Sequence, residues 1–151
     1  MNCCDKVSSV YTAYSKHFFF AKMLVSAFVL KKNYLPLNPF NNWEYFLDDM
    51  VERELVVRAN NNLIFVADEV WTFGPISDGV FREVQLANSL ALPIKHFSLG
   101  KTLSDIHSIS ADDLLFENEM IQQFNTEDIM SEFGLFNASQ VVGIIDAKGV
   151  C

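Results

Sequence analysis

Residues 62–97 constrain the fold more than any other part of the sequence. They read NLIFVADEVWTFGPISDGVFREVQLANSLALPIKHF, which is an apolar run, a turn-rich loop, an amphipathic segment and a second apolar run. Apolar runs separated by a helical pattern are typical of parallel strands joined by a helix. The turn Ser77-Asp78-Gly79 is then expected to open that helix. The first backbone N–H groups of a helix lack internal partners and can bind an anion.

The rest of the chain continues this alternation. The expected strands cover residues 7–13, 34–37, 63–67 and 93–97, and the expected helices cover residues 16–32, 43–60 and 78–90. This spacing predicts a doubly wound α/β fold, flavodoxin-like or Rossmann-like. We expect a parallel sheet of about five strands in a three-layer α/β/α arrangement. Ligands bind outside the carboxyl ends of such strands, where residues 11–15, the region of Asn38 and residues 68–79 are expected to meet.

The last third of the chain differs in character from the first two. Residues 101–132 are acidic, with helix starts at Ser110 or Ala111 and at Asn125 or Thr126. Residues 141–146 either form the fifth strand or pair with a partner. We therefore divide a single domain into an α/β core, residues 1–100, and an acidic, helical extension, residues 101–151, which is a candidate surface for a protein partner.

Composition excludes several classes of function. The formal net charge of −8 and the pI near 4.7 argue against binding a nucleic-acid polymer, which depends on many Lys and Arg contacts. Cys3, Cys4 and Cys151 form no disulfide framework, and no Cys or His has metal-ligand spacing, so we expect neither a metal nor another cofactor. The apolar run at residues 18–30 is too short to cross a membrane. We expect a cytoplasmic protein.

Two short motifs resemble a known family. Residues 77–83 read SDGVFRE and are similar to the Ser-x-Gly-Val-x-x-Glu motif of 2'-deoxynucleoside 5'-phosphate N-hydrolases, in the nucleoside 2-deoxyribosyltransferase superfamily. Tyr11-Thr12-Ala13 is similar to the Tyr-x-Ala segment that ends the first strand in that family. Residues 68–74, DEVWTFG, look closest to uncharacterised, partly phage-borne members. The resemblance covers roughly residues 7–100.

The resemblance implies cleavage of an N-glycosidic bond, or deoxyribosyl transfer, on a nucleoside or nucleoside 5'-monophosphate. It makes Glu83 the nucleophile, and it makes Tyr11 the hydroxyl that orients the Glu83 carboxylate. It also implies a homodimer or a larger homo-oligomer. A carboxylate suits this chemistry because cleavage develops oxocarbenium character at the sugar. The candidate contacts to phosphate and substrate are Ser77, Asp78, Gly79, Ser15, Asp68 and Trp71.

The sequence departs from the family pattern and leaves alternatives open. In place of the family's second acid, an Asp, the chain has Glu52, and Asp49 one turn earlier is the substitute. Trp71 either stacks on a base or belongs to the core or an interface. The alternative to an enzyme is a non-catalytic nucleotide sensor whose acidic extension contacts a protein. A third reading gives the terminal Cys151 a role as a thiol attachment point or inserted tail.

Overall fold

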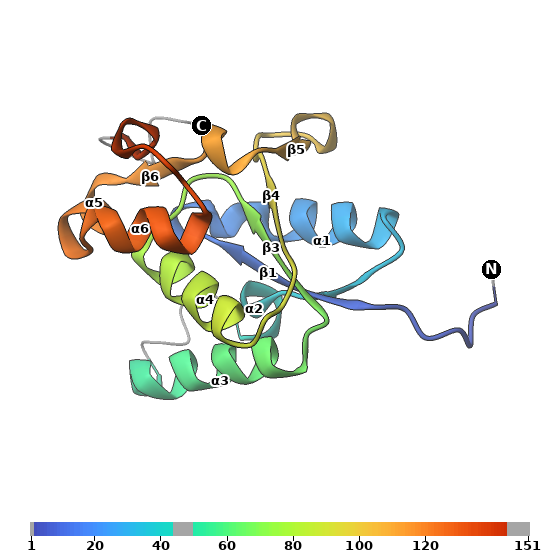
Figure 1. The fold of residues 1–151 in the computed structure, drawn as a ribbon. Helices are drawn as coiled ribbons and strands as arrows, with labels where there is room; N and C mark the ends of the chain where they lie inside the picture. The colour runs from blue at the N-terminus through green and yellow to red at the C-terminus, as the bar shows by residue number, and fades with distance from the viewer. Residues whose placement is uncertain (1, 44–49, 145–151) are drawn as a thin grey trace.

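A five-stranded sheet runs through the centre of the protein (Figure 1). The computed structural model describes residues 2–43 and 50–144. The strands of the sheet are β1 Ser9–Tyr14, β2 Leu35–Leu37, β3 Glu69–Phe73, β4 Ile94–Phe97 and β5 Ser108–Ile109. They lie in the order β2-β1-β3-β4-β5, in which the first four are parallel and β5 is antiparallel to β4. The predicted α/β class and the three-layer arrangement are confirmed.

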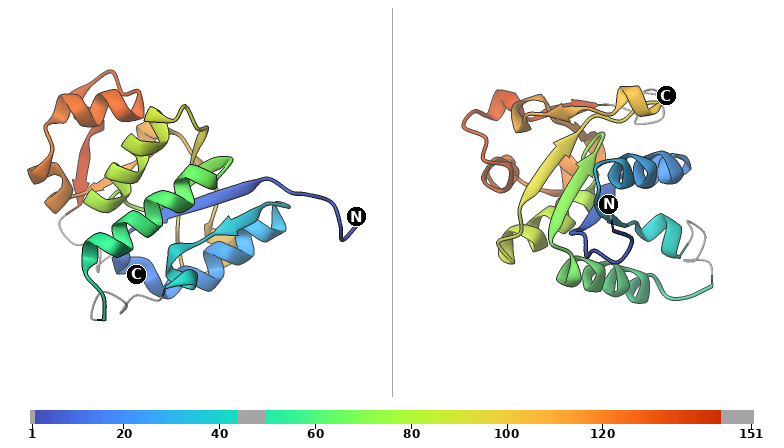
Figure 2. Two further views of the ribbon diagram at one scale, coloured as in Figure 1. Left: turned by 90° about the horizontal axis from the view of Figure 1, so that it is seen from below. Right: turned by 90° about the vertical axis from the view of Figure 1, so that its right-hand side faces the viewer.

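Helices cover both faces of this sheet. The helical segments of the first hundred residues are η1 Lys16–Ala21, α1 Lys22–Lys31, α2 Pro39–Asn42, α3 Arg53–Val66 and α4 Asp78–Ser89. Helix α1 packs on one face through Phe28 and Val29. Helices α3 and α4 pack on the other face through Ile64, Phe81 and Val84. Figure 2 shows α1 and α4 on opposite sides of the strands.

Side-chain alternation along the strands assigns each residue to one face. Tyr11 and Val70 belong to the core on the α3–α4 side, whereas Val10, Trp71 and Phe73 belong to the aromatic core on the α1 side. Successive side chains of a strand point to opposite faces, so this division follows directly from the registers of β1 and β3. Any residue whose side chain contacts the Tyr11 side chain must therefore lie on the α3–α4 side of the sheet.

The C-terminal third packs on the same core. Its elements are η3 Leu103–Asp105, η4 Ala111–Asp113, β6 Leu115–Glu117, α5 Asn118–Gln123, α6 Thr126–Phe133, η5 Ala138–Gln140 and β7 Val142–Ile144. Strands β6 and β7 form a separate parallel pair. Phe116, Met120 and Ile129 are fully buried in the core that contains Tyr11. The predicted extension is thus part of the same folded unit in the residues that the structure describes.

Several local predictions are confirmed. Strand β1 and the segment η1–α1 occupy the expected ranges, and β2 and β4 match the strands expected before and after the central region. Ser77 caps α4, because its side chain accepts a hydrogen bond from the Val80 N–H. Asn125 caps α6 in the same way through the N–H of Asp128.

The middle of the chain differs in part from the prediction. Of the helix expected at residues 43–60, the described part is helical only from Arg53, where α3 begins, and residues 44–49 lie outside the described residues. Helix α2 precedes this range, and the Asn38 side chain caps it. The strand expected at residues 63–67 is instead the last part of α3. Ile64 is buried there while Phe65 and Val66 are 57% and 68% exposed. This is the one-sided burial of a helix, and the central strand is the next apolar run, β3.

One of the two alternatives for residues 141–146, the fifth strand of the main sheet, is wrong for their described part. The main sheet ends with β5, which pairs with β4 through Phe97 and Ser108. The described part of residues 141–146 forms β7, which pairs with β6 outside the main sheet. The helix expected from Ser110 or Ala111 is only the short turn η4. In the described residues, no helix is long and apolar enough to cross a membrane.

Candidate functional site

A hydrogen bond joins the two residues that the sequence singled out most strongly. The Tyr11 hydroxyl donates to Glu83 Oε1 over 2.6 Å. Tyr11 is completely buried on β1, and Glu83 lies one and a half turns into α4, so the bond connects strand and helix across 72 residues of sequence. Glu83 is only partly covered. The bond therefore fixes the orientation of the Glu83 carboxyl group relative to β1.

The N-terminus of α4 lies beside this pair. Ser77 is buried, and its Oγ accepts from the Val80 N–H over 3.3 Å. Asp78 is the first residue of the helix and is close enough to Glu83 to act on it electrostatically. Gly79 is exposed, and a side chain there would meet no atom closer than the Ser77 hydroxyl at 3.8 Å. The helix start is thus open on the Gly79 side.

The environment shifts the proton affinities of both partners. Burial raises the pKa of Glu83 to about 7, the bond from Tyr11 lowers it in part, and the charge of Asp78 adds to the rise. Burial also raises the pKa of Tyr11 well above its usual value, and the neighbouring Glu83 raises it further. Tyr11 consequently remains a donor at neutral pH, while Glu83 titrates near pH 7. Such perturbed groups are concentrated at functional sites.

A second buried acid, Glu117, lies close to the same helix start. It ends β6, and its N–H donates to the carbonyl of Ile76 over 2.9 Å. Its side chain is only 7% exposed and interacts with the buried Ser15 hydroxyl. Burial raises the pKa of Glu117, with a smaller contribution in the same direction from Asp78. The negative charge of Asp78 therefore raises the pKa of both Glu83 and Glu117.

Sequence reasoning missed Glu117. The segment LLFEN holds an acid at the carboxyl end of a short apolar run and before a helix, which is the signal that marks a strand end. That segment fell within the region expected to be helical. Only its pairing with the loop after β3, at Ile76 and Phe116, brings Glu117 to the site.

Two predicted acids lie elsewhere, and a third cannot be placed. Glu52 precedes the first residue of α3, and its side chain is exposed. Asp68 lies at the amino end of the sheet, where its carboxylate accepts from the N–H and the hydroxyl of Ser9. The expected position of Asp68 at the carboxyl ends of the strands is wrong, because β3 begins one residue after it. Asp49 lies outside the described residues.

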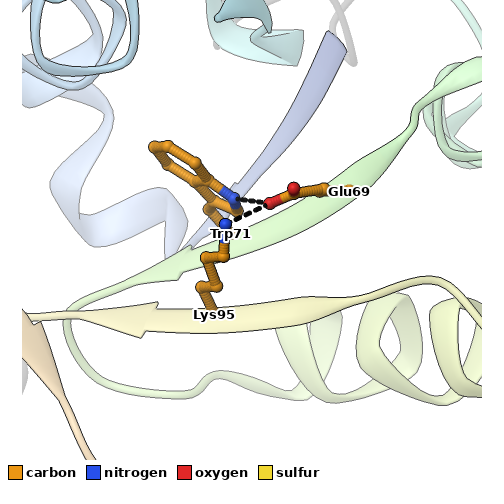
Figure 3. A network of polar contacts seen from close by, with 3 residues as sticks. All are labelled: Glu69, Trp71 and Lys95. Carbon is orange, nitrogen blue, oxygen red and sulfur yellow. Dashed lines mark hydrogen bonds and ion pairs between the residues drawn. The ribbon is translucent and has the colours of Figure 1, made fainter. Parts of the chain in front are cut away.

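Trp71 also lies away from Glu83, on the opposite face of the sheet. Its indole N–H donates to Glu69 Oε2 over 2.7 Å, and that same oxygen forms an ion pair with Lys95 over 2.8 Å (Figure 3). The ring packs against Tyr34 and Phe97, and only 2% of the residue is exposed. Trp71 is a core residue, and the expected base contact does not fit this position.

The cysteines and the other ligand types form no evident centre. Cys3 and Cys4 are free and exposed, and Cys151 lies outside the described residues. Within residues 2–43 and 50–144, no group of three or more His, Cys, Asp or Glu side chains has an arrangement that could hold a metal ion. The clustered chemistry therefore consists of Tyr11, Glu83 and the residues around the start of α4.

Comparison with known proteins places the chain in a family. A family model described as a domain of unknown function (DUF7768) matches residues 5–97, which is more than half of the chain. The chain belongs to this family. The matched range contains Tyr11, Ser77 and Glu83, and it ends before Glu117. No curated protein matches the chain.

Proposed function

We propose that the protein cleaves the N-glycosidic bond of a nucleoside or nucleoside 5'-monophosphate, or transfers its deoxyribosyl group, with Glu83 as the nucleophile. The observation that supports this most is the 2.6 Å bond from Tyr11 to Glu83. The resemblance of the two motifs to nucleoside 2-deoxyribosyltransferase-like enzymes requires a tyrosine to orient this glutamate. The two residues are far apart in sequence, so their contact is an independent point in favour.

The reaction that follows has two steps. The free Glu83 oxygen attacks the anomeric carbon, the bond from that carbon to the base nitrogen breaks, and its electron pair leaves with the base, which takes up a proton from solvent or a neighbouring acid. Water, or the nitrogen of a second base, then attacks the same carbon and releases the Glu83 carboxylate. The attacking water or base gives up one proton. The protein supplies a carboxylate already oriented toward one face of the sugar.

The surroundings of Glu83 suit this role. A nucleophilic carboxylate must be ionised yet weakly solvated, and a pKa of about 7 leaves a substantial ionised fraction at neutral pH. The Tyr11 hydroxyl occupies Oε1, so the second oxygen is the one left to attack. The neighbouring negative charge of Asp78 adds to the stabilisation of a positive oxocarbenium-like centre.

Base release from a panel of substrates tests the proposal. The wild-type protein is incubated with the common 2'-deoxynucleosides and their 5'-monophosphates, and free base is measured by chromatography. We expect Glu83→Gln and Glu83→Ala to lower the rate by about a thousandfold or more, since a covalent nucleophile is lost. Glu69→Gln is the matched control, because Glu69 is an acid on β3 outside the site, and this variant should retain activity.

Two results would contradict the proposal. One is the absence of base release from every substrate, and the other is release that is unchanged in both Glu83 variants. Thermal stabilisation by the same compounds without base release would instead support the sensor alternative, in which Tyr11 and Glu83 only bind the sugar.

A further inference from the structure

The carboxyl group of Glu117 has a buried oxygen that no described residue satisfies. Its Oε1 is shielded from solvent and has no hydrogen-bond partner among the residues that the structure describes. The backbone on either side is well anchored, since the Ile76 N–H donates to Leu115 and the Glu117 N–H donates to Ile76, each over 2.9 Å. A buried acceptor without a partner costs free energy. A ligand that donates a hydrogen bond to this oxygen would offset that cost.

The groups around Glu117 are those of the candidate site. The carboxyl group interacts with the Ser15 hydroxyl, and its proton affinity responds to His17, Asp78 and Glu119. Asp78 acts in the same way on Glu83. Asp78, the first residue of α4, is therefore close enough to both Glu83 and Glu117 to raise the pKa of each.

The charges near this helix start oppose a phosphate. Ser77 Oγ accepts from the Val80 N–H and Ser15 Oγ accepts from the His17 N–H, each over 3.3 Å, which leaves the proton of each hydroxyl for a further bond. Ser15 also interacts with Glu117. A phosphate placed at this helix start would meet the charges of Asp78 and Glu117 at short range. Like charges in a weakly solvated site repel strongly, so these acids oppose a dianion.

We propose that Glu117 is a specificity-determining residue that accepts a hydrogen bond from the 5'-hydroxyl of a nucleoside and excludes a 5'-phosphate. The inference rests on the proposed function, because the 5' end of the sugar is placed at Ser77 by the resemblance. It narrows the substrate class to nucleosides with an uncharged 5' end. It also assigns a role to a residue beyond the range that the family model matches.

The experiment compares three substrates with the same base. They are a 2'-deoxynucleoside, its 5'-monophosphate and the 2',5'-dideoxynucleoside, which lacks the 5'-hydroxyl. We expect the wild type to use the nucleoside with a kcat/KM at least tenfold above that of either analogue. A buried acceptor built for a hydroxyl discriminates against analogues that leave it unpaired or repel it.

The variant Glu117→Gln removes the charge and preserves the shape. It should lower kcat/KM for the nucleoside about tenfold, mainly through KM, and should shrink the preference over the monophosphate at least tenfold. Glu127→Gln is the matched control, since it removes an exposed charge of the same kind on α6, away from Glu117. It should leave the substrate ratios unchanged. Thermal melting of each variant verifies that it folds, and the wild-type comparison of the three substrates needs no variant.

The possible outcomes separate this inference from the proposed function. Base release with an equal or better rate on the monophosphate, or ratios unchanged in Glu117→Gln, overturns the role of Glu117 and leaves the role of Glu83 standing. If no substrate releases base, the proposed function fails, and calorimetric titration of the wild type with the nucleoside and the monophosphate decides the inference. Tighter binding of the nucleoside supports it, whereas equal binding, the reverse order or no binding overturns it.

Discussion

Two partly buried glutamates of the protein, Glu69 and Glu83, have pKa values that are shifted in opposite directions. Glu69 lies at the amino end of β3, where desolvation raises its pKa but hydrogen bonds from Lys95 and Trp71 outweigh it, so the pKa is lowered. Glu83 lies on α4 with the neutral Tyr11 hydroxyl as its hydrogen-bond donor, and burial raises its pKa to about 7. The first acid is neutralised by a cation, and the second is not.

The comparison separates a structural acid from a candidate catalytic one. A carboxylate that serves packing is paired, because an unpaired buried charge destabilises the fold. A carboxylate that must react has to keep its charge available and its proton affinity near the working pH. Glu69 meets the first description and Glu83 the second. Variants of Glu83, Glu69 and Tyr11 test this contrast.

The largest effect on stability is expected at Glu83. The pKa of Glu83 is about 7 in the folded protein against an ordinary value of 4.5. Below pH 4.5 both states hold the proton, and the full stability is present; it is lost as pH rises through 7, because the unfolded state ionises more readily. Glu83→Gln does not titrate and should be more stable than the wild type by about 3 kcal/mol at pH 8 and by little at pH 4.5.

Urea unfolding of both proteins at the two pH values measures this difference. Glu69→Gln is the counterpart, and it should lower the free energy of unfolding at pH 8 because Lys95 loses an ionised partner. A Glu83→Gln variant less stable than the wild type at pH 8 would show that the ionised form of Glu83, like that of Glu69, stabilises the fold.

A smaller effect is expected from removing the hydroxyl that holds Glu83. The bond from Tyr11 lowers the pKa of Glu83, so Tyr11→Phe should move the acid limb of the pH dependence of kcat/KM to higher pH. It should also lower kcat/KM at neutral pH by about tenfold, since one oriented hydrogen bond to a charged group is lost. Tyr14→Phe is the control, because its hydroxyl donates to Asn38 on the opposite face. A shift of the acid limb to lower pH would contradict this reading of the pair.

The central pair, Tyr11 and Glu83, was predicted from the resemblance of two short motifs to a known family. Ser77 and Glu83 lie six residues apart on one helix, so a single cap fixes the position of both relative to the helix start. Tyr11 was assigned from the resemblance of Tyr11-Thr12-Ala13 to a family segment, and the alternation along β1 then places its side chain in the core on the α3–α4 side. Both motifs consist of residues that are neighbours in sequence, so their local structure does not depend on distant contacts.

The failures came where the choice depends on distant contacts. Residues 63–66 and 70–73 are two apolar runs separated by only three residues, and local periodicity does not decide which becomes the strand. Strand β3, which contains the second run, pairs with β1 over five positions, and this pairing settles the choice. Glu117 is the same kind of case, because only the pairing of β6 with Ile76 brings it to α4. Sequence motifs thus predicted Tyr11, Ser77 and Glu83, whereas Glu117 joins the site only through tertiary contacts.

The smallest expected effect concerns the cation that neutralises Glu69. Lys95 bonds to Glu69 over 2.8 Å and lies over the rings of Tyr34 and Trp71, but its side chain is 46% exposed. Solvent screens such a pair, so Lys95→Met should lower the free energy of unfolding by no more than about 1 kcal/mol at pH 7. The loss should fade at acid pH, because the stability that the lowered pKa of Glu69 provides is lost as pH falls through that pKa. Lys101→Met, an exposed lysine elsewhere, is the control, and urea unfolding at pH 7 and pH 3 is the measurement. A loss that persists at pH 3 would mean that Lys95 stabilises the fold by packing on the rings. The charge of Lys95 would then explain less of the difference between the pKa values of Glu69 and Glu83.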